Sequence, residues 1–214
     1  MGEQVAGGPD VMLNAADMPR IEPLSYDHAD KTTRDLWDQM RERWDRTQPG
    51  PDLEHPLFKT FMHHPDLFRV HSPFVQYLKN STTLPVRHRE IAILRSAWNC
   101  GVDDQWVNHT EIGLECGLSQ EEIGRIPVGA DAPEWSAEEA ALLAAVDQLH
   151  FTCRIGDDTW AALARQYNKR QLIELLLLVG NYRTLGYVQN NVGIRPVTGT
   201  TPDLAGNRFL FPAT

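Results

Sequence analysis

Apolar residues recur at the spacing of an α-helix through most of this sequence, and helix-capping signals separate one run from the next. Ser119 and Ser136 each stand three residues before a glutamate, which is the pattern of a capping box. No segment alternates apolar and polar residues as a half-buried strand does, and no Asn-Gly or Asp-Gly turn joins two strands. The sequence therefore predicts an all-α chain.

The helical pattern occupies the middle of the chain. We expect one domain over residues 25–192, because residues 1–24 and 193–214 are rich in Gly, Pro and small polar residues and show no period. These ends are interpreted as an N-terminal arm and a C-terminal tail. Pro73 predicts a kink or a restart of its helix after Ser72, and the last helix is expected to end near Val188.

Composition and charge exclude several classes of protein. With 20 Lys+Arg against 29 Asp+Glu, the formal charge is −9, which argues against a general nucleic-acid binder. The most apolar stretch, residues 172–179, contains a glutamate and is far shorter than the roughly 20 residues that a bilayer requires. The start has no signal-peptide pattern, and an odd count of three cysteines favours free thiols in a reducing compartment. We expect a cytoplasmic protein that binds neither nucleic acid nor membrane.

One helix carries a mixed face that suggests a site for chemistry. After Gly101 the apolar positions of the helix surround one imidazole, His109, and one amide, Gln105. The preceding helix carries Glu90, and two helices joined at Gly101 can fold back on each other so that Glu90 approaches His109. A carboxylate can fix the tautomer of an imidazole while an apolar wall excludes water, which suits acid/base chemistry. The same pair can also be a purely structural contact between two core helices.

The motifs around this pair resemble the carboxymuconolactone decarboxylase family and its alkylhydroperoxidase D-like relatives. The resemblance rests on Leu-Pro-x-Arg-x-Arg-Glu at residues 84–90, Trp-x-x-His at 106–109 and Gly-Leu-Ser-x-Glu-Glu-Ile at 117–123. Flanking segments extend it to about residues 20–192. It implies an all-α, alkylhydroperoxidase D-like helical fold and a homo-oligomer (dimer, trimer or hexamer) with sites at or near subunit contacts.

The resemblance does not include the redox motif of the family. The peroxidatic branch uses a glutamate, eleven residues, and then Cys-x-x-Cys-x-x-x-His. Glu90 and His109 have that separation, but Val102 and Gln105 occupy the two thiol positions. The dithiol of that branch is therefore absent.

The cysteines of this chain do not replace that dithiol. Cys100 and Cys116 stand at opposite ends of the helix, about 20 Å apart along its axis, which is far beyond disulfide reach. Cys153 lies in another segment. Peroxidase-type (peroxiredoxin-like) activity by ancestry is therefore an alternative that the sequence disfavours.

The decarboxylase branch typically shows Glu-Trp-x-x-His where this chain has Gln105 at the first position. An amide cannot shuttle a proton at neutral pH. Either His109 and Glu90 suffice for the chemistry, or the family reaction is lost and the chain is a non-catalytic oligomeric binding protein. We favour the first reading: a cofactor-independent lyase/decarboxylase or isomerase that acts on a small, lactone-like substrate bearing a carboxylate or carbonyl group.

In that scheme His109 is the acid/base and Glu90 orients it. The other candidates bind the small-molecule substrate: Gln105 by donating to a developing oxyanion, Trp106 as an apolar wall, Arg87 or Arg95 by holding a carboxylate, and Tyr182 by reaching the pocket. Each has a structural alternative, which is an ion pair between helices for the arginines and core packing for the tyrosine.

Four of the eight histidines fall close together, at positions 55, 63, 64 and 71. No pair of them has the His-x-x-x-His spacing of a helical zinc site. We expect helix-entry or surface roles for them and no metal site. The acid/base scheme requires no organic cofactor either.

Overall fold

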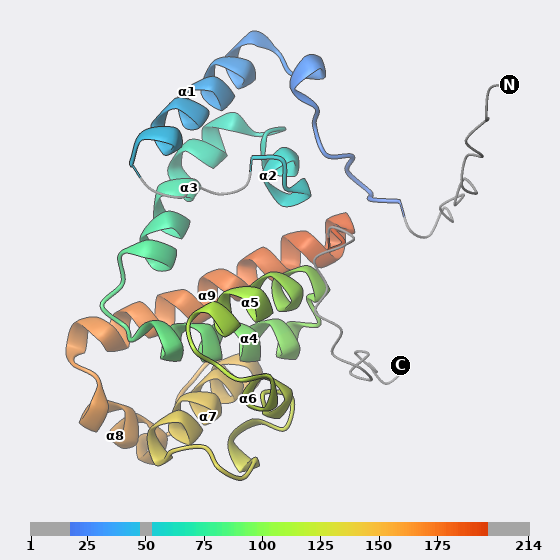
Figure 1. Cartoon of the computed structure of the whole chain (residues 1–214). Helices are drawn as coiled ribbons and strands as arrows, with labels where there is room; N and C mark the ends of the chain where they lie inside the picture. Colours follow the sequence, from blue (N-terminus) through green and yellow to red (C-terminus); the bar gives the residue numbers. More distant parts are fainter. Residues whose placement is uncertain (1–17, 48–52, 197–214) are drawn as a thin grey trace, which may run out of the picture.

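The computed structural model describes residues 18–47 and 53–196, and every regular element in these ranges is a helix (Figure 1). The predicted all-α fold is confirmed. Most of the predicted N-terminal arm and C-terminal tail lies outside the described residues. In chain order the elements are η2 (Tyr26–His28), α1 (Lys31–Thr47), α2 (Pro56–Phe61), α3 (Pro65–Asn80), α4 (Val86–Cys100), α5 (Asp103–Glu115), α6 (Gln120–Arg125), η3 (Gly129–Asp131), α7 (Ala137–Thr152), α8 (Asp157–Gln166) and α9 (Lys169–Val192).

Helix α4 is the centre of the fold. It packs against α5, α7 and α9, and Ile91, Ile93 and Leu94 on it are fully buried. Such a helix is stable only inside a core, where each buried aliphatic side chain contributes roughly 1.5–3 kcal/mol. Gly101 caps α4 in the left-handed conformation, with φ of 62°, and turns the chain back into α5. This is the fold-back that the sequence predicted.

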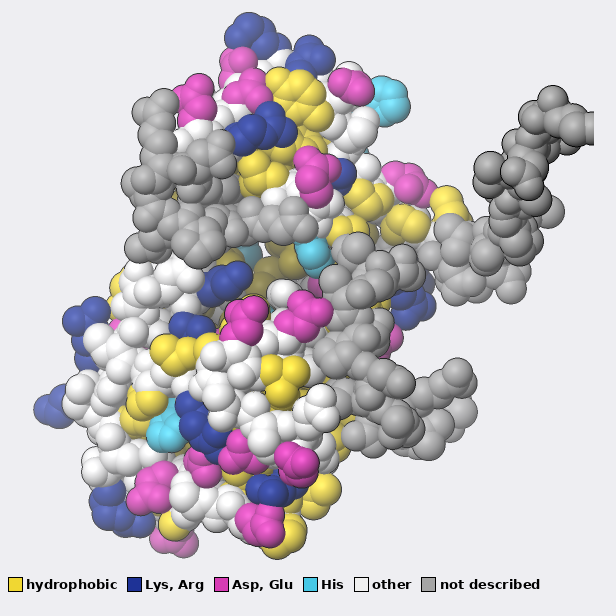
Figure 2. All heavy atoms as spheres, viewed as in Figure 1, with side chains coloured by type: hydrophobic (Ala, Val, Ile, Leu, Met, Phe, Trp, Pro, Cys, Tyr) yellow, Lys and Arg dark blue, Asp and Glu magenta, His cyan; other side chains and the backbone are white. Residues whose placement is uncertain are grey.

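Helices α1, α2 and α3 form a second apolar cluster at one side of this body (Figure 1). Trp37 packs edge-on against Phe58, with 5.5 Å between the ring centroids, and Phe58 packs in the same way on Phe68 at 5.0 Å. Helix α3 also contacts α9 of the main body. Figure 2 shows that the surface is hollowed between the two groups, with apolar side chains inside the hollow.

Two helix starts follow the capping boxes predicted at Ser119 and Ser136, and α9 starts in the same way at Asn168. Ser119, Ser136 and Asn168 each form a complete capping box: the side-chain oxygen accepts from the backbone N–H three residues on, and the side chain of that residue accepts from the N–H of the cap. Two orphan donors are satisfied at each start. Local sequence therefore sets where these three helices begin.

The structure excludes a restart at Pro73 and extends the last helix beyond its predicted end. Helix α3 does not restart after Ser72 but continues through Pro73, because buried side chains on both sides of the proline hold it against its neighbours. Helix α9 continues to Val192 rather than ending near Val188, and Gly193 caps it in the left-handed conformation with φ of 86°. Among the described residues, no helix combines the length and the apolar character that crossing a bilayer requires.

Arg95, which the sequence offered as a carboxylate-binding group, braces the loop after α6 instead. Its buried guanidinium donates to the two oxygens of Asp147 on α7 at 2.6 and 2.9 Å, and to the carbonyl oxygens of Ile126 and Pro127 at 2.7 and 2.8 Å. Gly129, with φ of 85°, passes so close that a Cβ there would lie 2.7 Å from Nη2 of Arg95. The arginine is thus a structural tie between α4, α7 and this loop.

Replacing Gly129 should therefore damage the fold. We expect Gly129→Ala to lower the free energy of unfolding by about 2–3 kcal/mol, because the new methyl group meets Arg95 and the backbone is in a region that L-residues rarely adopt. Gly124→Ala on α6 is the matched control, since its Cβ would meet nothing within 4 Å. It should be neutral or stabilising by up to about 1 kcal/mol. Urea unfolding followed by circular dichroism measures both, and equal stabilities of the two variants would contradict the assignment.

Candidate active site

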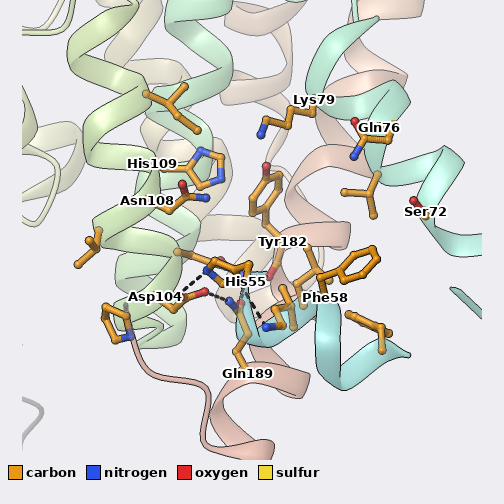
Figure 3. Close-up of a pocket in the computed structure, with 18 of the residues that line it drawn as sticks. His55, Phe58, Ser72, Gln76, Lys79, Asp104, Asn108, His109, Tyr182 and Gln189 are labelled. Carbon is orange, nitrogen blue, oxygen red and sulfur yellow. Dashed lines mark hydrogen bonds and ion pairs between the residues drawn. The ribbon is translucent and has the colours of Figure 1, made fainter. Parts of the chain in front are cut away.

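A cavity of about 530 Å³ lies between the α1–α3 group and the face of the main body formed by α5 and α9. Helices α2 and α3 contribute Phe58, Phe61 and Phe68 to the lining, and α5 and α9 contribute His109 and Tyr182. Figure 3 shows Phe58, His109 and Tyr182 around this cavity. Small-molecule pockets typically measure about 300–1,000 Å³ and combine an apolar lining with a few polar groups. The arrangement of the two helical groups therefore builds a place for a small molecule.

The structure brings Glu90 and His109 together beside this cavity. Glu90 on α4 is 1% exposed and His109 on α5 is 4% exposed, and Oε2 of the carboxylate lies 2.7 Å from Nδ1 of the imidazole. A charged carboxylate at this depth is tolerated only when its oxygens are hydrogen-bonded. The pair predicted from the sequence is thus a buried contact with one member, His109, on the cavity wall.

Arg89 completes the environment of the carboxylate. Its Nε donates to Oε1 of Glu90 at 2.8 Å, and its Nη1 donates to the carbonyl oxygen of Lys79. Burial alone would raise the pKa of Glu90, but the hydrogen bond and charge of His109, together with those of Arg89, outweigh it and hold the pKa below its ordinary value. Glu90 is therefore ionised at neutral pH, and its two oxygens accept hydrogen bonds from Nε of Arg89 and Nδ1 of His109.

The second nitrogen of His109 is the group available for chemistry. Nδ1 of His109 is bonded to Glu90. Its other ring nitrogen, Nε2, has no hydrogen-bond partner among the described residues. The ring of Tyr182 on α9 packs edge-on against the imidazole, with 5.0 Å between ring centroids. One imidazole edge is thus fixed by a carboxylate while the other can meet a molecule in the cavity.

A chain of buried polar groups joins α5, α9 and the start of α2 along another part of the wall (Figure 3). Nε2 of Gln105 donates to Oε1 of Gln189 at 2.6 Å and to the carbonyl oxygen of Tyr182 at 3.1 Å. Nε2 of Gln189 donates to Oδ2 of Asp104 at 2.5 Å, and Oδ1 of Asp104 lies 3.1 Å from Nε2 of His55. This chain ties the α1–α3 group to the main body.

These hydrogen bonds give Gln105 a different role from the predicted one. Its amide nitrogen is occupied by two acceptors, so it cannot be the oxyanion donor that the sequence suggested, and its Oε1 has no hydrogen-bond partner among the described residues. His55 is also occupied on both sides, because Nδ1 accepts from the backbone N–H of Leu57 while Nε2 faces Asp104. His55 therefore has no ring nitrogen left for a ligand, whereas His109 has one.

Sequence reasoning missed Lys79. Its side chain enters the cavity from α3, and Figure 3 shows its ammonium group and the hydroxyl of Tyr182 pointing toward each other. A weak signal was present, because Ser72, Gln76 and Lys79 follow one another at i, i+4 and i+7, and all three line the cavity. A polar stripe on an otherwise apolar helix marks a face that does not enter a core.

Arg87 and Trp106 do not line the cavity. Arg87 donates to Glu139 on α7 at 2.8 Å and to both oxygens of Glu122 on α6 at 2.5 and 3.1 Å. Trp106 is buried in the main core, where its ring lies 5.7 Å from that of Trp98. The structure thus brings four predicted residues to the site (Glu90, Gln105, His109 and Tyr182) and places Arg87, Arg95 and Trp106 elsewhere.

The thiols also lie away from the cavity lining. Sγ of Cys100 is 3.8 Å from Nδ1 of His150, Cys116 ends α5, Cys153 is exposed, and no disulfide joins them. Burial raises the pKa of both the Cys100 and the Cys116 thiol, which disfavours the reactive thiolate.

The clustered histidines have separate local roles. His63 bonds the carbonyl oxygen of Glu22 at 2.8 Å, His64 caps α3, and His71 packs on Phe61. In the described ranges, no three His, Cys, Asp or Glu side chains gather in a way that could hold a metal ion.

The contribution of Glu90 to stability should depend on pH. Its pKa in the folded protein is below its ordinary value of 4.5, so its contribution is complete above that value and is lost as the pH falls through the lower, folded-state pKa. We expect Glu90→Gln to lower the free energy of unfolding by roughly 2–4 kcal/mol at pH 7, and the gap to wild type to shrink in acid.

Urea titrations at a series of pH values measure that gap. Glu115→Gln, at an exposed position on α5, is the control and should match wild type throughout. A gap between wild type and Glu90→Gln that is constant down to pH 3 would contradict an ionised Glu90.

Part of the chain is similar to a known protein family. Residues 65–148, which span α3 to most of α7, match the model of the carboxymuconolactone decarboxylase family. A sequence search of curated proteins finds no match.

Solved structures share the fold. A protein of unknown function from Agrobacterium tumefaciens is 19% identical, covers 64% of this chain and 94% of its own, and has a TM-score of 0.60. An uncharacterised peroxidase-related protein from Ralstonia eutropha is 13% identical, with 84% and 94% covered and a TM-score of 0.66. A debrominase in complex with 2,3,4-tribromopyrrole is 12% identical, with 89% and 96% covered and a TM-score of 0.62. At these identities the likeness shows the fold alone.

Proposed function

Because residues 65–148 match the model of the carboxymuconolactone decarboxylase family, we propose that this chain is a cofactor-independent lyase/decarboxylase or isomerase. Its substrate is a small lactone-like molecule that carries a carbonyl or carboxylate group. The observation that carries the proposal is the buried Glu90–His109 contact of 2.7 Å, whose free imidazole nitrogen is on a cavity wall. A purely structural pair needs no cavity beside it.

The chemistry follows from what the pair can do with one proton. When a carboxylate on the carbon next to a conjugated carbonyl leaves as CO₂, the electron pair of the broken C–C bond moves into the carbonyl group as an enolate. Protonated His109 then gives the Nε2 proton to one carbon of that enolate and recovers a proton from water. Glu90 stabilises the imidazolium through Nδ1 without being protonated itself.

An isomerase uses the same group in two directions. Neutral His109 takes a proton from the carbon between a carbonyl group and a double bond, and the electron pair spreads over the dienolate. The imidazolium then returns the proton to the far end of the conjugated system. No proton, electron or atom is gained or lost overall, so the pair suffices for either reaction class.

The alternative functions have less support. The peroxidase-type route needs a reactive thiol, and Val102 and Gln105 hold the two dithiol positions while the three cysteines lie away from the cavity lining. The hypothesis of a non-catalytic oligomeric binding protein predicts that the Glu90–His109 pair is closed off from any cavity. Here His109 lines the cavity. The acid/base assignment therefore accounts for more of the site.

Deuterium exchange tests the assignment whatever the natural substrate is. α-Angelica lactone, a β,γ-unsaturated lactone, should incorporate solvent deuterium and shift its double bond when incubated with the protein in D₂O, as followed by proton NMR. We expect His109→Gln to slow this reaction by about 10²–10⁴-fold, which is the usual contribution of a positioned acid/base. His28→Gln, at an exposed position outside the cavity, is the matched control. Exchange at the buffer rate with wild type, or at the wild-type rate with His109→Gln, would contradict the proposal.

Removal of the thiols tests the redox alternative. The triple variant Cys100→Ser, Cys116→Ser, Cys153→Ser should exchange deuterium at the wild-type rate, because no thiol lines the cavity. Wild type should consume tert-butyl hydroperoxide with dithiothreitol no faster than the reagents alone. Peroxide consumption by wild type that disappears in the triple variant would establish the redox function in place of the acid/base one.

A further inference from the structure

The ammonium group of Lys79 has no counter-ion in the cavity it enters. Its side chain is half-buried on the lining, and no carboxylate of residues 18–47 and 53–196 lies within ion-pair distance of it. Glu90 attracts it at longer range, but both Glu90 oxygens are already bonded, to Arg89 and His109. A half-buried cation without a partner favours an anion that arrives from outside the chain.

The other acidic groups on the lining do not fill that role. Asp104 is held by His55 and Gln189, and Glu111 borders the cavity without an ion pair to Lys79. Burial lowers the pKa of Lys79, and the charge of Glu90 opposes this effect. The charge of Glu90 offsets the loss of hydration only in part, and a bound anion would offset the rest.

The hydroxyl of Tyr182 supplies a second donor at the same place. The residue is 5% exposed, and none of the described residues hydrogen-bonds to its hydroxyl, which Figure 3 shows pointing toward Lys79 beside His109. Burial, together with the charge of Glu90, raises the pKa of Tyr182, so the phenol stays protonated and can donate. Two donors, one charged and one neutral, therefore converge next to the free nitrogen of His109.

The aromatic residues on the α2 and α3 side of the cavity indicate the shape of the molecule. Phe58, Phe61 and Phe68 come from α2 and α3 and present an aromatic surface, with Val75 beside them. Planar, conjugated groups pack well on such a surface. A ligand with one acidic end and one flat apolar end could contact the Lys79 and Tyr182 donors and the aromatic surface at once.

We propose that Lys79 and Tyr182 form an anion-binding pair that holds the carboxylate of a planar, conjugated or aromatic acid, with its flat body on the Phe58–Phe61–Phe68 wall. This assignment rests on the proposed function for its position beside His109, and it narrows the substrate class from small molecules with a carbonyl or carboxylate group to planar, unsaturated carboxylic acids. Lys79 and Tyr182 also take the substrate-binding role that the sequence suggested for Arg87, Arg95 and Gln105, because protein groups occupy the donors of those three residues. The carboxylate bound by Lys79 and Tyr182 serves only for binding. It stays on the substrate and is not the group that leaves as CO₂.

Calorimetric titration with trans-cinnamate and with the neutral trans-cinnamamide tests the pair. Wild type should bind cinnamate at least about tenfold more tightly than cinnamamide, because only the acid forms a charge-assisted contact with Lys79. Lys79→Met should erase this preference and leave cinnamamide binding unchanged. Tyr182→Phe should weaken cinnamate several-fold, and Lys169→Met, at an exposed position on α9, should behave as wild type.

Several results would contradict the proposal that Lys79 and Tyr182 bind the carboxylate. Equal binding of acid and amide by wild type, undetectable cinnamate binding at millimolar concentration, or wild-type cinnamate affinity in Lys79→Met would each do so, provided that circular dichroism shows the variants folded. Because binding is measured without turnover, this test is separate from deuterium exchange. Selective cinnamate binding without deuterium exchange would contradict the acid/base function and support the binding pair. Deuterium exchange without a preference for cinnamate would support the acid/base function and contradict the binding pair.

Discussion

The buried contact between Glu90 and His109 is the interaction on which the site depends. It joins α4 and α5 across the turn at Gly101 and uses the inner nitrogen of the imidazole, so that the outer nitrogen faces the cavity. Arg89 takes the other carboxylate oxygen and keeps a charge that burial alone would neutralise. The helices of the core thereby hold one imidazole at a fixed position and in a fixed tautomer.

The cavity exists because the apolar residues form two clusters rather than one. The α1–α3 cluster supplies an aromatic wall and Lys79, and the main body supplies His109 and Tyr182. The chain from Gln105 to His55 connects the two groups through polar contacts. With a formal charge of −9 for the whole chain, an anionic substrate must be attracted locally, and Lys79 provides that local charge.

Sequence predicted what is decided locally. The capping boxes at Ser119 and Ser136 located two helix starts, and the helices joined at Gly101 placed Glu90 against His109. It did not predict where Arg87 and Arg95 point, because the carboxylates that occupy them, Glu139 and Asp147, are about fifty residues away along the chain. Lys79 was missed for the same reason, since only the packing of the α1–α3 group brings it to the cavity wall. Long-range partners decide which charged groups remain available for a ligand.

The tautomer of His109 is the most direct test of this account. Long-range proton–nitrogen NMR of the imidazole at pH 7 should show a proton on Nδ1, because only a protonated Nδ1 can donate to the ionised carboxylate of Glu90. In Glu90→Gln this preference should weaken, with the proton redistributed toward Nε2. A wild-type spectrum in which Nδ1 carries no proton and Nε2 alone is protonated would contradict the central claim that Glu90 fixes His109 with its reactive nitrogen toward the cavity.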